Sequence, residues 1–227
     1  MGAGSNRRSA SIEDYVRTIY GLEERGEAVT NAALSSRLEV SPSSASGMVA
    51  KLARQGLVEH VPYRGIELTS EGRLLARSVL RRHRLIETFL VSELGYTWDE
   101  VHAEADLLEH VVSDLLIERI AAKLGNPERD PHGDPIPAVD GSVEEVSTKL
   151  LEDLPAGAVG EIVRVWDTDP ELLRYLAERS IGLGKRIEVV ERQPFGGSII
   201  VQIGQPPHAA THALGREIAQ ALSVSTR

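Results

Sequence analysis

Side chains that can bind a metal ion recur at helical spacing in two segments of a chain that has no cysteine. These segments contribute His83 and Glu87, and then His102, Asp106, Glu109 and His110. Residues three or four apart share a face of a helix, and eight residues of helix span roughly 12 Å, which suits two ions better than one. The alternative is a solvated polar face, but six such groups on two matched stripes favour a metal centre. Without thiolates, nitrogen and oxygen atoms must hold any metal.

The composition indicates an ordinary globular protein. The chain has 227 residues, of which 41% are hydrophobic, enough for one large domain or two to three small ones. No apolar run approaches the roughly 18 residues that cross a bilayer, and the polar start of the chain lacks the hydrophobic segment of a signal peptide. We therefore expect a cytoplasmic protein with no membrane partner.

The net charge of −9 is unevenly distributed along the chain. Residues 1–90 hold 13 Lys and Arg against 10 Asp and Glu, whereas residues 91–227 hold 12 against 24. A mildly basic first third joined to an acidic remainder is typical of a DNA-binding module attached to a cation-binding one.

The first 70 residues follow the pattern of a winged helix-turn-helix. Apolar spacing predicts helices over 11–24, 30–38 and 42–55, with Thr30 and Ser41 as N-caps and Gly56 after the third helix. Two β-prone runs, 57–61 and 66–69, predict a hairpin. A small helical module with an incidental hairpin is the alternative.

The third helix would read DNA with an unusually small outer face. Small side chains allow close approach to the groove but few base contacts, so DNA shape should supply much of the specificity. Basic side chains would anchor phosphates. The predicted DNA-contacting residues are Ser41, Pro42, Ser43, Ser44, Gly47, Lys51, Arg54 and Arg64.

Apolar helical patterns continue over 70–94 and 111–124, and Thr97 with Glu100 forms a capping box for a helix that carries the 102–110 stripe. These helices need a partner surface, and we expect the same helices of a second copy. Four prolines make 126–141 a connector. Residues 142–152 are expected to be helix or linker. Strands over 158–166, 185–192 and 198–203, with a helix over 170–180, predict a small β-barrel with one inserted helix.

Four parts of the sequence carry a family resemblance: Tyr15 to Tyr20, Arg82 to Leu85 with Glu87, Glu109 with His110, and Gly133 to Pro137. They resemble the diphtheria toxin repressor family of metal-dependent transcriptional repressors, and its manganese-sensing branch in particular. The resemblance implies a mainly α protein with small β parts. Its expected domains are a winged helix (1–76), a helical dimerisation and metal-binding domain (77–141), a linker (142–152) and an SH3-like, FeoA-like small β-barrel (153–227).

The resemblance also implies roles for individual residues, with two ions for each subunit. The primary site would use Asp14, Asp106, Glu109 and His110, and the second site His83, Glu87 and His102. Asp130, His132 and Asp167 are further candidate ligands of the second site, and Arg84 would hold an anion beside it.

The ligand types favour Mn²⁺, with Fe²⁺ as the alternative. The iron-sensing branch has a methionine and a cysteine where this chain has Asp14 and Asp106, and hard oxygen ligands suit Mn²⁺ better than sulfur does. Some two-domain manganese sensors carry a glutamate where this chain has Arg17, so their closely spaced pair of ions is not expected here.

The sequence therefore predicts a repressor rather than an enzyme. Metal would link Asp14 of the DNA module to the dimer core and favour binding of the homodimer to palindromic operator DNA. A winged-helix regulator of an organic ligand is one alternative. A metallohydrolase is another, but no HExxH motif is present, and no small organic substrate is expected.

Overall fold

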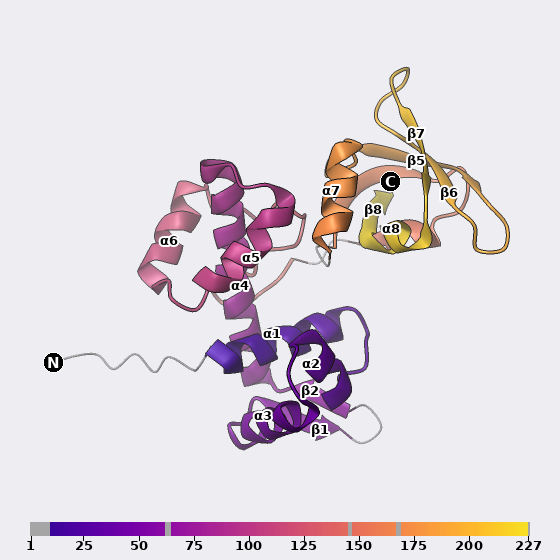
Figure 1. Ribbon diagram of the computed structural model, residues 1–227. Helices are drawn as coiled ribbons and strands as arrows, with labels where there is room; N and C mark the ends of the chain where they lie inside the picture. The colour runs from indigo at the N-terminus through magenta and orange to yellow at the C-terminus, as the bar shows by residue number, and fades with distance from the viewer. Residues whose placement is uncertain (1–9, 62–64, 145–146, 167–168, 227) are drawn as a thin grey trace. The chain divides into compact units, whose positions relative to one another are not determined.

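The computed structural model describes residues 10–61, 65–144, 147–166 and 169–226, and Figure 1 shows the order of their helices and strands. The chain forms two compact units. Unit 1 comprises residues 1–83, 109–112 and 137–142, and unit 2 comprises residues 84–108, 113–136 and 143–227. Among the described residues, no helix combines the length and the apolar character needed to cross a bilayer.

Unit 1 contains the predicted winged helix-turn-helix. Its elements are α1 (Ala10–Glu24), α2 (Asn31–Arg37), α3 (Pro42–Arg54), the strands β1 (Val58–Val61) and β2 (Gly65–Leu68), and the first part of α4 (Ser70–Leu94). The strands pair as an antiparallel hairpin. Both predicted N-caps are confirmed, because Thr30 accepts a hydrogen bond from the Ala33 amide and Ser41 accepts one from the Ser44 amide.

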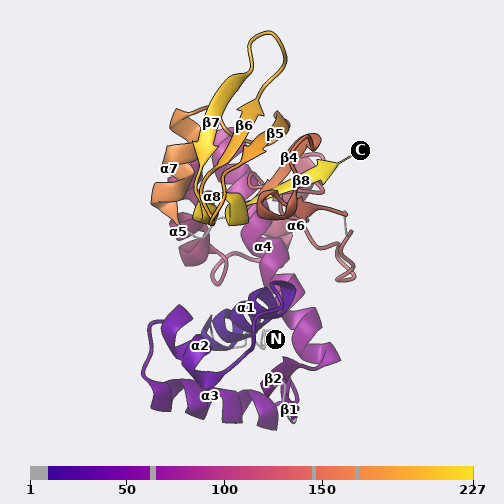
Figure 2. The ribbon, with the colours of Figure 1, turned by 90° about the vertical axis from the view of Figure 1, so that its right-hand side faces the viewer.

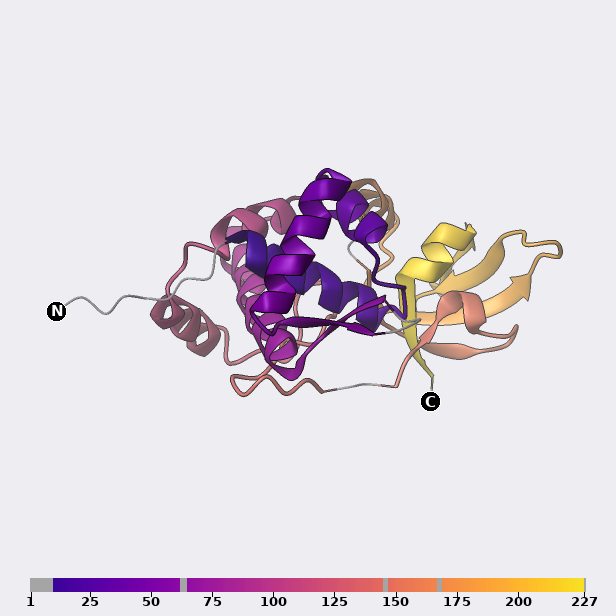
Figure 3. The same ribbon diagram turned by 90° about the horizontal axis from the view of Figure 1, so that it is seen from below.

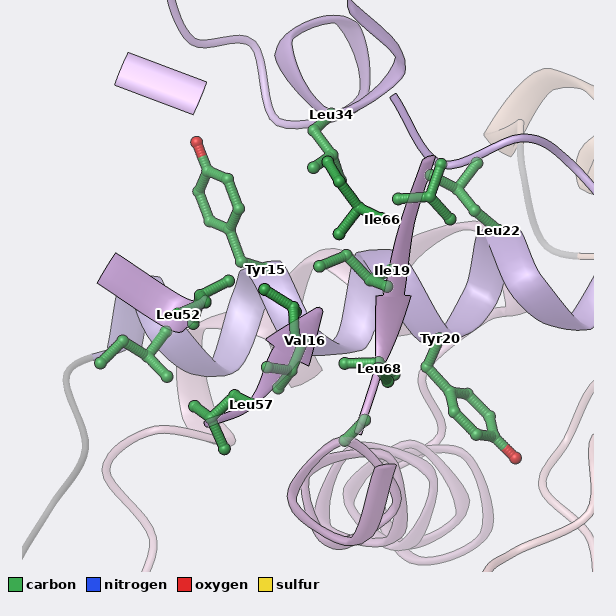
Figure 4. Packing of buried hydrophobic residues seen from close by; sticks show 14 of the residues in the cluster. Tyr15, Val16, Ile19, Tyr20, Leu22, Leu34, Leu52, Leu57, Ile66 and Leu68 are labelled. Carbon is green, nitrogen blue, oxygen red and sulfur yellow. The ribbon is translucent and has the colours of Figure 1, made fainter. Parts of the chain in front are cut away.

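The core of unit 1 holds α1 in place. Val16 and Ile19 are fully buried, and they pack with residues of α2, α3 and the hairpin such as Leu34, Leu52 and Ile66 (Figure 4). Burying side chains of this size stabilises the fold by roughly 1.5–3 kcal/mol each. The apolar face of α1 is thereby fixed toward the hairpin, which also fixes where its polar residues lie.

The helix predicted to carry the whole 102–110 stripe is shorter than expected. α5 spans Trp98–Leu108, so Glu109 and His110 lie in the turn that follows it. The next helix, α6, spans Asp114–Lys123 rather than 111–124, because Ser113 accepts a hydrogen bond from the Leu116 amide and caps a new helix there. One half of the predicted capping box is present, because the Thr97 amide donates to the Glu100 carboxylate at 3.2 Å; the Thr97 hydroxyl donates to the same carboxylate at 2.7 Å.

The C-terminal part of unit 2 is a six-stranded antiparallel sheet with the strand order β3-β8-β4-β5-β6-β7. Its strands β5, β6 and β7 lie side by side in Figure 2. The strands are β3 (Lys149–Leu150), β4 (Val159–Val165), β5 (Arg186–Arg192), β6 (Ile199–Ile203), β7 (Ala210–Leu214) and β8 (Leu222–Thr226). The helical segments are η1 (Leu151–Asp153), α7 (Pro170–Glu178) and α8 (Arg216–Ala221), of which α8 lies next to β8 (Figure 3).

The sheet departs from the sequence-based expectation at both of its ends. Lys149 and Leu150 were expected in a helix or linker, but they form β3 and pair with β8. After residue 203 the chain adds β7, α8 and β8, so α7 is not the single inserted helix. β8 lies between β3 and β4, which means that residues more than 50 positions apart in the sequence pair on this side of the sheet.

Candidate metal centre

Three predicted ligands of the primary site come together in unit 1. His110 Nε2 lies 2.8 Å from Asp14 Oδ1 and 3.4 Å from Glu109 Oε1. One ligand atom from each of these three residues falls within 4.8 Å of the other two. Asp14 is positioned by α1, and the other two by the turn after α5. The arrangement gathers two carboxylates and one imidazole around one point.

Glu13 belongs to this cluster although the sequence reasoning did not select it. Its Oε2 lies 2.8 Å from His110 Nδ1, and its side chain is only 9% exposed. A carboxylate on one ring nitrogen fixes the orientation of the imidazole and leaves the other nitrogen for a metal. Helical periodicity gives one available signal. Glu13 lies three residues before Val16 and seven before Tyr20, so the spacing places this carboxylate on the apolar, buried face of α1.

The charges around His110 raise its pKa. Burial alone would lower the pKa of His110, but the hydrogen bond with Glu13 and the negative charges of Glu109, Asp14 and Glu13 together raise that pKa above its ordinary value. A histidine must be neutral to ligate, so a proton and a divalent ion compete for this imidazole.

Glu109 is fully buried and is held on one side by two cationic or donor groups. Its Oε2 accepts a hydrogen bond from Arg17 at 3.3 Å and lies 2.7 Å from His83 Nδ1. Its Oε1 has no hydrogen-bond partner within the described part of the chain. A buried carboxylate oxygen without a donor is costly unless something else, such as a cation, satisfies it.

The second predicted cluster is partly assembled in unit 2. Glu87 is fully buried, and its Oε1 lies 3.1 Å from His102 Nδ1. His102 Nε2 lies 3.7 Å from Asp106 Oδ2. Within unit 2, therefore, Asp106 contacts the histidine of the predicted second site. His83 lies on α4 one turn before Glu87.

The connector supplies two further candidates and one buried ion network. His132 is fully buried, packs at 5.6 Å against the ring of Trp98, and its two ring nitrogens have no hydrogen-bond partner among the described residues. Asp130 caps its own loop, since its Oδ1 accepts from the amides of His132 and Asp134. Asp167 lies outside the described residues.

Arg84, predicted to hold an anion, has carboxylates of the chain itself beside it. Its guanidinium lies 3.5 Å from both Asp130 and Asp134 and donates to the Pro135 carbonyl at 2.7 Å. Asp134 also pairs with Arg164 of β4. This network fastens the connector to α4 and to the sheet within unit 2.

The predicted DNA-contacting face of α3 is exposed. Ser41, Pro42, Ser43, Ser44 and Gly47 all face solvent, while Ala45 and Leu52 turn inward to the core. Arg54 is exposed and Lys51 is partly buried. Arg64 of the wing lies outside the described residues.

The donor set of the Asp14 cluster fits a divalent ion. Carboxylate oxygens are hard ligands that suit Mn²⁺, imidazole suits several transition metals, and the open Oε1 of Glu109 faces the same point as His110 Nε2. The residues therefore bring together the charge and the lone pairs that such an ion needs.

Three family models match consecutive parts of the chain. "Iron dependent repressor, N-terminal DNA binding domain" matches residues 8–66, "Iron dependent repressor, metal binding and dimerisation domain" matches residues 69–138, and "FeoA domain" matches residues 149–226. Asp14 falls in the first match, and Glu109 with His110 falls in the second.

Known proteins of similar sequence and structure span nearly the whole chain. The "Iron-dependent repressor IdeR" of Mycobacterium leprae is 36% identical over 220 residues, covering 90% of this chain and 95% of that protein. A solved "Manganese-dependent transcriptional repressor complex with manganese" is 46% identical with a TM-score of 0.90, covering 95% of this chain and 100% of the other. The "manganese regulator SloR" structure is 33% identical with a TM-score of 0.80, covering 95% and 98%.

Proposed function

The chain belongs to the iron-dependent, or diphtheria toxin, repressor family of metal-dependent DNA-binding repressors, and from that premise we propose that it is a manganese-activated repressor that controls metal-ion homeostasis. The observation that carries the proposal is the Asp14, Glu109 and His110 cluster, in which hard oxygen donors and one imidazole converge without sulfur. Members of this family are transcriptional repressors, not enzymes.

The primary site would be held by Asp14, Glu109 and His110, with Asp106 proposed as a fourth ligand. A bound divalent ion would supply the positive charge that balances the carboxylates of this site. Glu13 would orient the imidazole of His110 through Nδ1, and Glu109 would present Oε1. The chain's own contribution is a rigid set of oxygen and nitrogen atoms fixed by the core of unit 1.

The choice of manganese over iron rests on ligand type. Asp14 and Asp106 offer oxygen, and this chain has no cysteine and no methionine besides Met1 and Met48. Softer sulfur ligands would shift the preference toward other metals, whereas carboxylates suit Mn²⁺. The similarity to solved manganese-dependent repressors supports this choice, and the similarity to IdeR keeps Fe²⁺ as the alternative.

We propose a second ion at His83, Glu87 and His102, with Asp130, His132 and Asp167 as further candidate ligands. The support within unit 2 is the buried Glu87 in contact with His102, together with the two unsatisfied ring nitrogens of His132. The surroundings of Arg84 differ from those of an arginine that binds only an external anion, because the carboxylates of Asp130 and Asp134 already lie beside its guanidinium. An external anion there remains a prediction.

The proposed partners are a second copy of the chain and palindromic operator DNA. The family's dimerisation domain and DNA-binding domain support both. Two α3 helices of a dimer would have to be held at the half-site spacing of one helical turn of DNA, about 34–36 Å. A metal ion bound by Asp14 of α1 and by Glu109 and His110 would restrict the movement of α1 relative to the segment 109–112. Metal occupancy would then favour the arrangement of the DNA-binding domain that binds the operator.

Asp14→Ala tests this function. It removes one oxygen of the cluster, and we expect Mn²⁺ to stimulate operator binding at least about tenfold less than in the parent protein, measured by gel shift across a Mn²⁺ titration. Parallel anaerobic titrations with Mn²⁺ and Fe²⁺ separate the two metals.

Glu27→Ala is the matched control, because Glu27 is an exposed carboxylate of unit 1 that pairs with Arg37, away from the cluster. It should respond to Mn²⁺ like the parent protein. Unchanged stimulation in Asp14→Ala would refute the assignment of the primary site.

A further inference from the structure

The two oxygens of Glu109 have different environments. Oε2 is shared by Arg17 and His83, whereas Oε1 faces His110 and has no hydrogen bond among the described residues. His83 Nδ1 lies 2.7 Å from Oε2, and Arg17 Nη1 lies 3.3 Å from the same oxygen and 2.9 Å from His83 Nδ1.

Fixed positive charges balance most of the negative charge in this cluster. Arg17 pairs with Glu109, and Arg82 lies 3.6 Å from Glu13 while donating to the Glu109 carbonyl at 3.1 Å. Asp14, Glu13 and Glu109 contribute three negative charges, so the described cluster in unit 1 keeps about one net negative charge when His110 is neutral. Buried carboxylates in such a site depend strongly on their partners.

The orientation of Glu109 limits how it can ligate. A carboxylate that binds an ion through both oxygens must turn both toward it, but Oε2 is committed to Arg17 and His83. Ca²⁺ takes six to eight oxygen ligands and often binds carboxylates through both oxygens, whereas smaller transition-metal ions accept fewer ligands and favour imidazole. An arginine that reserves one carboxylate oxygen thus disfavours the larger ion.

We propose that Arg17 is a positioning residue that makes Glu109 a one-oxygen ligand and thereby lets the Asp14 site discriminate against Ca²⁺. The inference rests on the proposed metal function of this site. Arg17 reaches the cluster because it lies on α1 one turn after Asp14, and its side chain is 20% exposed, so it is largely covered. Arg17 is the arginine that pairs with the Glu109 carboxylate in the described part of unit 1, where the imidazoles of His83 and His110 also contact it, at 2.7 and 3.4 Å.

Competition between Mn²⁺ and Ca²⁺ in the full-length protein tests this inference. Bound Mn²⁺ is followed by electron paramagnetic resonance while Ca²⁺ is added, and the signal that Asp14→Ala loses identifies the ion at this site. We expect Arg17→Gln to release that Mn²⁺ at a Ca²⁺ to Mn²⁺ ratio about tenfold lower than the parent protein does. Arg17→Lys, which keeps the charge, should restore part of the discrimination.

Arg37→Gln is the matched control, since Arg37 belongs to the same unit and, among the described residues, pairs with the exposed Glu27 and not with the cluster. Its ratio should equal that of the parent. Circular dichroism and thermal melting of the metal-free variants report on folding, and Arg17→Lys carries the test if Arg17→Gln does not fold. A parental ratio in a folded Arg17 variant overturns the inference. Absence of Mn²⁺ binding in the parent protein itself overturns the proposed function instead.

Discussion

At the scale of single residues, the two ring nitrogens of His110 have different roles in the cluster. Its Nδ1 faces Glu13 and its Nε2 faces Asp14 and Glu109, so one nitrogen sets the orientation and the other is directed at the ligand point. The two oxygens of Glu109 differ in the same way: Oε2 contacts His83, and Oε1 is directed at the ligand point. The same residue types spread over a solvated surface would lack these fixed directions.

Gly47 lies on the exposed face of α3, where the absence of a side chain allows close approach to DNA. A Cβ added at Gly47 would meet no atom within 4 Å. Replacing a helical glycine by alanine stabilises a helix by roughly 0.5–1 kcal/mol, so we expect Gly47→Ala to raise the melting temperature. A methyl group on a face that approaches DNA closely should weaken operator binding about tenfold, which corresponds to about 1.4 kcal/mol.

Gly21→Ala provides the control, because Gly21 is a helical glycine of α1 with the same open surroundings. It should be stabilising without a change in operator affinity, as measured by fluorescence anisotropy with labelled DNA at fixed salt. Parental affinity in Gly47→Ala would mean that α3 does not approach the groove at this point.

At the scale of elements, residues 126–136 of the connector after α6 are an ordered part of unit 2 rather than a loose tether. Its carbonyl at His132 accepts a hydrogen bond from the Val165 amide at 2.8 Å, and Asp134 pairs with Arg84 and Arg164. The sequence predicted a connector from its prolines. It did not indicate that this connector packs on β4.

Gly133→Ala should loosen this packing. Gly133 has a φ of +86°, and an added Cβ would collide with the carbonyl oxygen of Val163. Backbone strain and the clash together should cost about 2 kcal/mol or more. We expect a lower melting temperature and faster proteolytic cleavage within residues 126–136.

Gly125→Ala separates the two causes, since Gly125 has a similar φ of +78° but open space around its Cβ position. Only the strain of about 1–2 kcal/mol applies there. Equal effects of the two substitutions would show that the contact with β4 contributes nothing.

At the scale of the whole molecule, the family's dimerisation domain and an exposed apolar surface point to the same feature. Leu115 and Leu116 of α6 are 63% and 47% exposed, while Ile117 and Ile120 face the interior of unit 2. Neighbouring exposed leucines of this kind mark interaction surfaces. A repressor that reads two half-sites needs such a surface.

The double variant Leu115→Arg, Leu116→Arg should therefore be monomeric in size-exclusion chromatography with light scattering. Because both side chains are exposed, the fold should persist, whereas operator affinity should fall by about a hundredfold or more when one half-site contact is lost. Phe195→Ser removes a still more exposed apolar side chain from the turn between β5 and β6 and should remain dimeric. A double variant that stays dimeric would exclude α6 from the interface.

Local patterns were sufficient for much of the fold. Thr30 and Ser41 marked helix starts, Gly56 marked a helix end, and the spacing in 70–94 defined α4, because caps and apolar periodicity act within a few residues. The end of α5 at Leu108 was missed, since Glu109 and His110 continue the helical spacing. β3 was missed because a two-residue strand has no pattern of its own and depends on its partner β8.

The sequence by itself determined the chemical types at the site: oxygen and nitrogen donors, no thiolate, and a winged helix beside them. Only the tertiary structure decided which of these groups meet. Glu13 and Arg17 join Asp14, Glu109 and His110 because the turn at residues 109–112 contacts α1 and brings residues more than 90 positions apart together. Spacing rules describe neighbours along one element, whereas a ligand set is defined by distances across several, and those distances follow from the packing of the core.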